Sequence, residues 1–209
     1  MIRFLRLFFI VLSTIVVLIL LVASVSKLLN LIAMHAGDLN FRPDSIETHY
    51  RDHLWLGYVH IVPGIIFLIL GGYQFVPYFR NRYVTIHRLI GKLFLILSTI
   101  IFITAIALAA FYPFGNILES VVTFLFGSFL LYCTYKAYTT ARNRKIAQHR
   151  KWVTRIYFIA IAVSTIRGII ALFMATGSDS MQSIFGLSFL IAFGIHLVLV
   201  ELWIRYLAK

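Results

Sequence analysis

Six long apolar blocks are the feature that most constrains how this chain can fold. A helix needs about 20 predominantly apolar residues to cross the hydrocarbon core of a bilayer. Blocks of about that length lie at residues 7–26, 54–78, 89–112, 118–140, 152–175 and 182–207. The hydrophobic fraction is 61% and the charged fraction only 12%, which is far outside the usage of soluble domains. The sequence therefore predicts an all-α polytopic transmembrane bundle with six spans.

The blocks also divide the chain into four predicted segments. We expect residues 1–26 to be an uncleaved first span, because the apolar run is longer than the usual core of a signal peptide. Residues 27–53 are predicted to form an extracytoplasmic loop. A four-helix membrane domain made of two helical hairpins should occupy residues 54–175, and residues 176–209 should form the sixth span and a cytoplasmic C-terminus.

One phrase occurs twice between the apolar blocks. Arg80-Asn81-Arg82 precedes His87-Arg88, and Arg142-Asn143-Arg144 precedes His149-Arg150, with four residues between the two parts in each copy. We interpret the phrase as the turn of a duplicated hairpin, in which spans two and three are related to spans four and five by a pseudo-two-fold axis. His87 and His149 would then lie at one depth of one membrane face. The alternative explanation is that the two turns are unrelated and came to resemble each other because each needed basic residues.

Lysine and arginine are distributed unevenly among the predicted turns. The chain has 19 Lys and Arg against 7 Asp and Glu, a formal net charge of +12. The cations gather at both ends of the chain and at residues 80–92 and 136–155, whereas residues 112–119 and 176–181 contain none. Because cytoplasmic loops are rich in Lys and Arg, we expect both termini in the cytoplasm and the protein in a bacterial inner membrane. The cations form no continuous soluble patch, so we expect lipid and not nucleic acid as their partner.

Several polar side chains fall inside the predicted spans. His60 and Gln74 share one face of the second span with small residues, and that face should point into the bundle. Arg167 lies within the fifth span, where a cation normally faces a partner, a cavity or the headgroups. His196 lies near the middle of the sixth span. The simpler explanation for a histidine at this depth is a neutral imidazole that hydrogen-bonds to another helix of the bundle. Gln74, Arg167 and His196 are therefore candidates for a polar interior.

Two further groups of charged or imidazole side chains can be explained without a functional site. Glu201 and Arg205 are one turn apart and should form an i,i+4 ion pair. His35, His49 and His53 accompany the acidic residues of the first outer loop and could hold a metal ion, but their irregular spacing is more typical of a solvated loop.

The repeated histidines are the main candidates for cofactor chemistry. Two neutral imidazoles from different helices can hold a haem iron, and nearby cations can hold its propionates. His87 and His149 are thus candidate axial ligands of haem b, with Arg88 and Arg150 beside them, and His60 is a candidate for a further site. The alternative is that each His-Arg pair anchors a helix at the membrane interface.

The ordered set of polar motifs resembles a bacterial family of predicted membrane proteins, domain of unknown function 2306. The resemblance is carried by His60, Gly71-Gly72-Tyr73-Gln74-Phe75, His87-Arg88-Leu89-Ile90-Gly91-Lys92, His149-Arg150-Lys151-Trp152 and Arg167. It implies a membrane protein and a group of residues to test, but no activity. A looser resemblance is to four-helix membrane cytochromes of the cytochrome b561 and ferric-reductase kind, from which this chain departs because no helix carries two histidines.

Three functional classes remain after the sequence is considered. The first is a haem-binding or membrane redox protein. The second is a transporter or a protein that binds lipid or a small anion, with His60 and Arg167 holding the anionic group. The third is a non-catalytic membrane assembly or scaffold protein. A nucleophile–base pair, a glycine-rich phosphate loop and an HExxH zinc motif are not found in the sequence.

Overall fold

The computed structural model describes residues 2–37, 51–177 and 180–207, and all regular elements in these ranges are helices. Six of the helices are long and apolar enough to span a membrane: Phe4–His35, Leu54–Phe75, Val84–Phe111, Ile117–Arg142, Ile146–Ala175 and Met181–Tyr206. The prediction of an all-α polytopic bundle with six spans is confirmed. His49 and the acidic residues at 38–50 lie outside the described residues.

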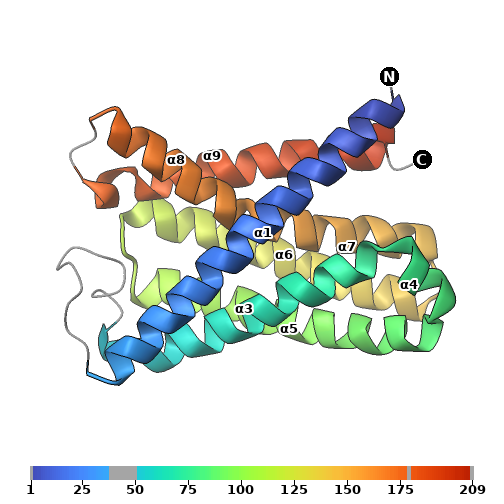
Figure 1. Ribbon diagram of the computed structural model, residues 1–209, viewed down its shortest axis with the longest axis horizontal. Coiled ribbons are helices and arrows are strands. Elements are labelled where there is room, and N and C mark those ends of the chain that lie inside the picture. Colours follow the sequence, from blue (N-terminus) through green and yellow to red (C-terminus); the bar gives the residue numbers. More distant parts are fainter. Residues whose placement is uncertain (1, 38–50, 178–179, 208–209) are drawn as a thin grey trace. The chain divides into compact units, whose positions relative to one another are not determined.

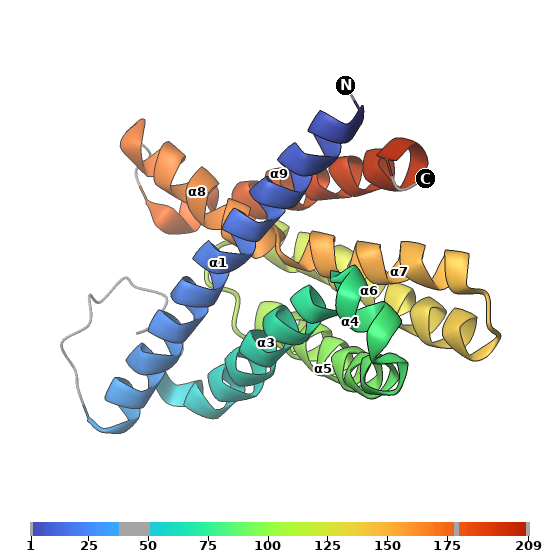
Figure 2. The same cartoon turned by 45° about the vertical axis from the view of Figure 1, so that its right-hand side comes forward.

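The chain forms two compact units (Figures 1 and 2). One comprises Leu21–Phe114, and the other comprises Met1–Leu20 together with Gly115–Lys209. The first helix, α1 (Ile2–His35), belongs to both. The helix ends at His35 and therefore continues past Lys27, into the segment 27–53 expected to be a loop. Its 34 residues make it about 51 Å long, which exceeds the roughly 30 Å thickness of a hydrocarbon core.

The first unit contains the first predicted hairpin. Its two long helices, α3 (Leu54–Phe75) and α5 (Val84–Phe111), pack side by side. The short 3-10 helix η1 (Arg51–His53) leads into α3, and α4 (Pro77–Arg82) connects α3 to α5. Phe67 and Phe94 stack between the two long helices with ring centroids 4.8 Å apart, and both rings are almost completely buried.

The second unit contains the second predicted hairpin and the last span. Its helices are α6 (Ile117–Arg142), α7 (Ile146–Ala160), α8 (Ala162–Ala175) and α9 (Met181–Leu202), followed by the π-helical turn η2 (Trp203–Leu207). Cys133, Ala137 and Ala192 are fully buried where these helices meet. Small side chains at such contacts let helix backbones approach closely, which favours helix association in a membrane.

Both hairpins consist of long helices joined by a turn, but the turns differ. α6 runs without interruption to Arg142, whereas the corresponding stretch of the first hairpin is divided into α3 and α4 at Val76. Pro77 explains the difference, because proline has no N–H and disfavours helical backbone in the residue before it. Val76 accordingly has an extended ψ of 113°. The pseudo-two-fold relation between the hairpins stays a prediction, since each unit is described by itself.

Candidate functional site

The two repeated histidines occupy the same position in their helices. α5 begins at Val84 and α7 at Ile146, so His87 and His149 are each the fourth residue of a helix. Each backbone N–H donates to the residue before the helix: His87 to Tyr83 O and His149 to Lys145 O, both at 2.9 Å. The duplicated phrase is therefore duplicated local structure.

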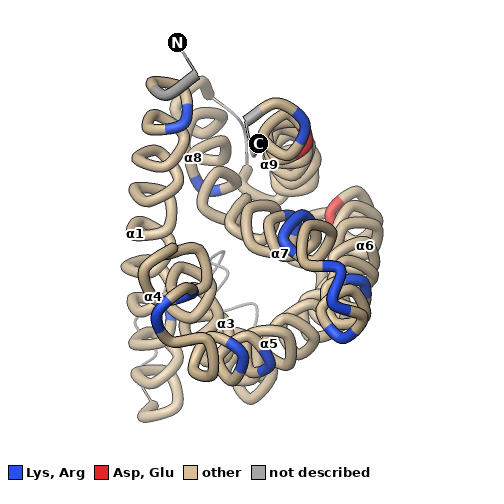
Figure 3. The backbone as a smooth tube through the Cα atoms, turned by 90° about the vertical axis from the view of Figure 1, so that its right-hand side faces the viewer, with Lys and Arg blue, Asp and Glu red and all other residues tan. Residues whose placement is uncertain are grey.

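Basic residues surround both of these helix starts. Arg88 and Arg150 are exposed beside the histidines. Figure 3 shows Lys and Arg along the turn between α6 and α7, and, in the other unit, along α4 and the start of α5. Arg144 in the α6–α7 turn has a positive φ of 59°, which an arginine adopts only in a tight turn. Each unit thus has one strongly cationic turn beside its histidine.

His149 is held by a hydrogen bond inside its own hairpin. Its Nδ1 lies 2.9 Å from the backbone oxygen of Ala137 on α6. A carbonyl oxygen only accepts, so Nδ1 must carry the proton, and in the neutral ring Nε2 then has a lone pair. The ring is half-buried. A ring oriented by Nδ1–H with an unprotonated Nε2 is the arrangement that metal-binding histidines commonly have.

Gln74 makes the corresponding connection in the first hairpin. Its Nε2 donates to the backbone oxygen of His87 at 3.3 Å, and its side chain is only 7% exposed. Gly91 on α5 faces this amide: a Cβ at that position would lie in ordinary van der Waals contact with it, at 3.7 Å. Gln74 therefore lies inside the hairpin and ties α3 to the start of α5.

His60 also joins the two helices of the first hairpin. Thr104 Oγ1 donates to Ile100 O at 2.8 Å, so it accepts the proton of His60 Nδ1 at 2.9 Å. Thr104 is buried and His60 is half-buried. The halves of α3 and α5 away from α4 are thus connected through an imidazole–hydroxyl contact, three residues before Pro63 in α3.

The side chain of Arg167 is exposed on α8. Arg167 belongs to the second compact unit and His60 to the first. The structure therefore does not bring these two together within one unit, and their joint role remains a prediction.

His196 on α9 is hydrogen-bonded through both ring nitrogens. Nδ1 donates to Phe158 O on α7 at 2.6 Å, and Nε2 lies 2.8 Å from Thr165 Oγ1 on α8. Because Nδ1 carries a proton toward a carbonyl, Nε2 of the neutral ring accepts from the threonine hydroxyl. His196 therefore connects α9 to both halves of the fifth span.

The fifth span is interrupted beside His196. α7 ends at Ala160, α8 begins at Ala162, and Ile161 between them has φ −71° and ψ −3°. Ser164 N donates to Ile161 O, a tight i→i+3 bond of 3.0 Å. Helical carbonyls in a last turn lose their regular backbone partners, and the Phe158 carbonyl that His196 binds lies in that turn.

Glu201 has a partner that the sequence did not indicate. The sequence predicts a pair with Arg205, but the carboxylate of Glu201 accepts two hydrogen bonds from Arg155 on α7. Arg155 also lies over the ring of Trp152, 4.6 Å from its centroid. One clue was available: Arg155 lies inside the apolar block predicted at 152–175, and Glu201 is the only acidic residue of the sequence after Asp179.

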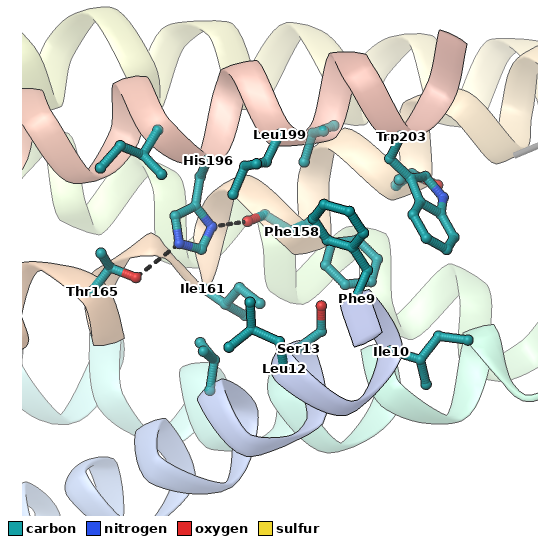
Figure 4. A pocket seen from close by; sticks show the side chains of 14 residues that line it. Phe9, Ile10, Leu12, Ser13, Phe158, Ile161, Thr165, His196, Leu199 and Trp203 are labelled. Carbon is teal, nitrogen blue, oxygen red and sulfur yellow. Dashed lines mark hydrogen bonds between the residues drawn. The ribbon is translucent and has the colours of Figure 1, made fainter. Parts of the chain in front are cut away.

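An apolar pocket lies within the second unit, where the first turns of α1 meet α7, α8 and α9 (Figure 4). Its volume is about 260 Å³. Ser13 of α1 and the His196–Thr165 pair are among its lining residues, and Phe9 and Trp203 lie toward one end. Ligand pockets in proteins are typically apolar with a few polar groups, so this pocket has the general character of a binding site.

The described residues contain no group of three or more His, Cys, Asp or Glu side chains placed to hold a metal ion. His53, one of the candidates of the predicted loop, lies against Tyr112 with centroids 3.9 Å apart and ring planes tilted by 36°, and His35 meets the edge of Tyr58 at 6.3 Å. A haem iron differs from a free metal ion in needing only two axial ligands from the protein.

Comparison with known proteins identifies a family but no activity. The model of the family described as "Predicted membrane protein (DUF2306)" matches residues 57–204, well over half of the 209 residues. The match runs from α3 to η2, so it includes both hairpins, the interrupted fifth span and His196. No curated protein and no solved structure has a significant match to the chain.

Proposed function

This chain belongs to the DUF2306 family of predicted membrane proteins, and we propose that it binds haem b and has a redox role in the membrane. The candidate iron ligands are His87 and His149, which belong to different units; their pairing rests on the repeated sequence motif. Arg88 and Arg150 would hold the propionates. Bound haem would supply a one-electron redox centre. The contribution of the protein would be to orient the two imidazoles and to neutralise the carboxylates.

The observation that carries this proposal is the hydrogen bond from His149 Nδ1 to Ala137 O. It sets the tautomer with Nε2 unprotonated and limits rotation of the ring, as a metal ligand requires. His87, at the equal position in its own helix, would supply the second imidazole. The charged neighbours have the sign that propionates need.

We further propose that the cationic turns face the cytoplasm of a bacterium and that the membrane is the inner one. The asymmetry of Lys and Arg supports this orientation. Both termini would then be cytoplasmic, and the haem would lie near the cytoplasmic interface.

An absorption spectrum of the purified protein tests the haem proposal. After expression with ample haem, the protein should show a Soret band that is lost or shifted in His87→Ala and His149→Ala. His35→Ala is the matched control, because His35 lies at the far end of α1 and outside the proposed site, and it should leave the spectrum unchanged. A wild-type protein without a Soret band, or a band indifferent to both substitutions, would falsify the proposal.

Binding of a small anion or a lipid headgroup is the second candidate. The observation that favours it is the exposed side chain of Arg167 within a membrane span, since an intramembrane cation is a functional candidate. Arg167→Ala should then abolish thermal stabilisation by inorganic phosphate or by phosphatidylglycerol vesicles, and leave any haem spectrum intact. If these substitutions change only the abundance of the protein, the scaffold function is supported instead.

A further inference from the structure

The pocket of the second unit has a distinctive composition. The described residues that line it include no Asp, Glu, Lys or Arg. Its polar groups are the side chains of Thr154, Thr165, Ser13 and His196 and the indole N–H of Trp203. Because a charged group would have no counter-ion there and would lose its hydration, the occupant must be neutral.

The walls of the pocket suit a flat ring. Phe9, Phe158 and Trp203 line it, and all three are labelled in Figure 4. The rings of Phe9 and Trp203 meet edge to face, with centroids 6.0 Å apart. Aromatic side chains prefer offset-stacked or edge-to-face contacts with other rings. A volume of about 260 Å³ exceeds the 150 Å³ that holds benzene in an engineered cavity, so a substituted ring fits.

The polar groups of the pocket are mostly hydroxyls, which both donate and accept. Ser13 points into the pocket from α1 (Figure 4), and Thr165 donates its proton to His196 Nε2 while keeping acceptor capacity on oxygen. A carbonyl in the pocket would accept from Ser13, and a hydroxyl in the same place would donate to Ser13 or Thr165. The pocket can therefore bind both a ring carbonyl and its reduced hydroxyl form.

We propose that this pocket binds the ring of a membrane quinone between α1 and the interrupted fifth span. One ring oxygen would accept a hydrogen bond from Ser13 as a carbonyl and would donate one to Thr165 as a hydroxyl. The two redox forms of a quinone carry a carbonyl and a hydroxyl respectively, and both are neutral and membrane-soluble. The assignment of the quinone as an electron partner rests on the redox function proposed above. Binding itself does not require haem.

The test is calorimetric titration of decylubiquinone, a short-tailed quinone, into the full-length protein in nanodiscs. Wild-type protein should bind it saturably. Ser13→Phe fills the pocket and should weaken binding by at least about tenfold, or roughly 1.4 kcal/mol. Ser26→Phe is the matched control, because Ser26 is exposed on the same helix and does not line the pocket, and it should bind like the wild type.

Thr165→Val supplies a second variant that preserves shape. Thr165 can only accept from the ring, so its loss should weaken binding of the reduced form, decylubiquinol, by about fivefold. Titration of decylubiquinol into this variant is the test if Ser13→Phe does not fold. Absence of saturable binding, unchanged binding in both pocket variants, or equally tight binding of oleic acid at the same site would overturn the quinone assignment. Saturable quinone binding by a protein without a Soret band would leave this proposal standing while the haem proposal fails.

Discussion

Arg155 on α7 and Glu201 on α9 form a bidentate ion pair, with Nε–Oε1 at 2.6 Å and Nη2–Oε2 at 2.8 Å. The side chain of Arg155 is 15% exposed and that of Glu201 is 42% exposed. The indole of Trp152 lies over the guanidinium at 4.6 Å. This geometry connects the second hairpin to the last span at the end of the unit where its Lys and Arg are concentrated.

Removal of Arg155 should destabilise the protein more than removal of Arg205. Arg155→Met takes both hydrogen bonds from Glu201 and should lower the free energy of unfolding by about 1–2 kcal/mol, since a bidentate, partly exposed pair is worth more than a simple surface pair. Arg205→Met is the matched control and should cost no more than about 0.5 kcal/mol. Unfolding in mixed detergent micelles measures both values. Equal losses of unfolding free energy in the two variants would show that the ion pair with Arg155 stabilises the protein no more than Arg205 does.

A methyl group at Gly186 should disrupt the contact between α6 and α9. A Cβ there would lie 2.5 Å from Asn116 Oδ1 and 2.6 Å from Glu119 N, too close for the backbone to stay in place. Gly186→Ala should cost about 1–3 kcal/mol, as overpacking usually does. Gly194→Ala on the same helix has no atom within 4 Å of the added Cβ and should stay within about 1 kcal/mol of the wild type. The melting temperatures of the two variants, measured by thermal denaturation under the same conditions, test this prediction. Similar decreases in melting temperature for both variants would contradict it.

Gln74→Ala should weaken the first hairpin. The substitution removes the hydrogen bond to His87 O and leaves a gap at a buried side chain, so we expect a loss of about 1–2 kcal/mol. Gln148 is exposed on α7, and Gln148→Ala should change stability by less than about 0.5 kcal/mol. Hydrogen exchange at the first turn of α5 gives a local readout, because it should accelerate in Gln74→Ala alone. Unchanged exchange there would mean that Gln74 does not hold this turn.

The proposed orientation predicts the behaviour of two reporter fusions. Green fluorescent protein joined after Arg144 should fluoresce, and alkaline phosphatase at the same point should be inactive, because the α6–α7 turn would be cytoplasmic. Alkaline phosphatase joined after Thr176 should be active on the opposite side. The reverse pattern would invert the topology for the whole chain.

The spans were predictable because hydropathy depends on the residues alone. The ends of the helices were less so: α5 and α7 begin at Val84 and Ile146, several residues before the apolar runs predicted at 89–112 and 152–175. A helix can continue beyond the hydrocarbon core into the interface, where basic residues are solvated and hydropathy no longer marks it. That extension places His87 and His149 inside helices and not in the turns before them.

The partners of the polar residues could not be predicted in the same way. Glu201 binds Arg155, 46 residues away in sequence, although Arg205 is a nearer candidate on its own helix. His196 binds Phe158 O and Thr165, one on each side of the break at Ile161. No spacing rule within one helix indicates such contacts, because they depend on how neighbouring helices are rotated and shifted.

The sequence by itself determined the membrane class and the number of spans, since these follow from apolar length, and its repeated motif predicted a duplicated hairpin. Only the tertiary structure decided which nitrogen of His149 is protonated, which cation holds Glu201, and that Ser13 and His196 line one pocket. The physical reason is that transfer into a bilayer is roughly additive over the residues of a helix, whereas hydrogen bonds and pockets require specific atoms of separate helices within a few ångströms.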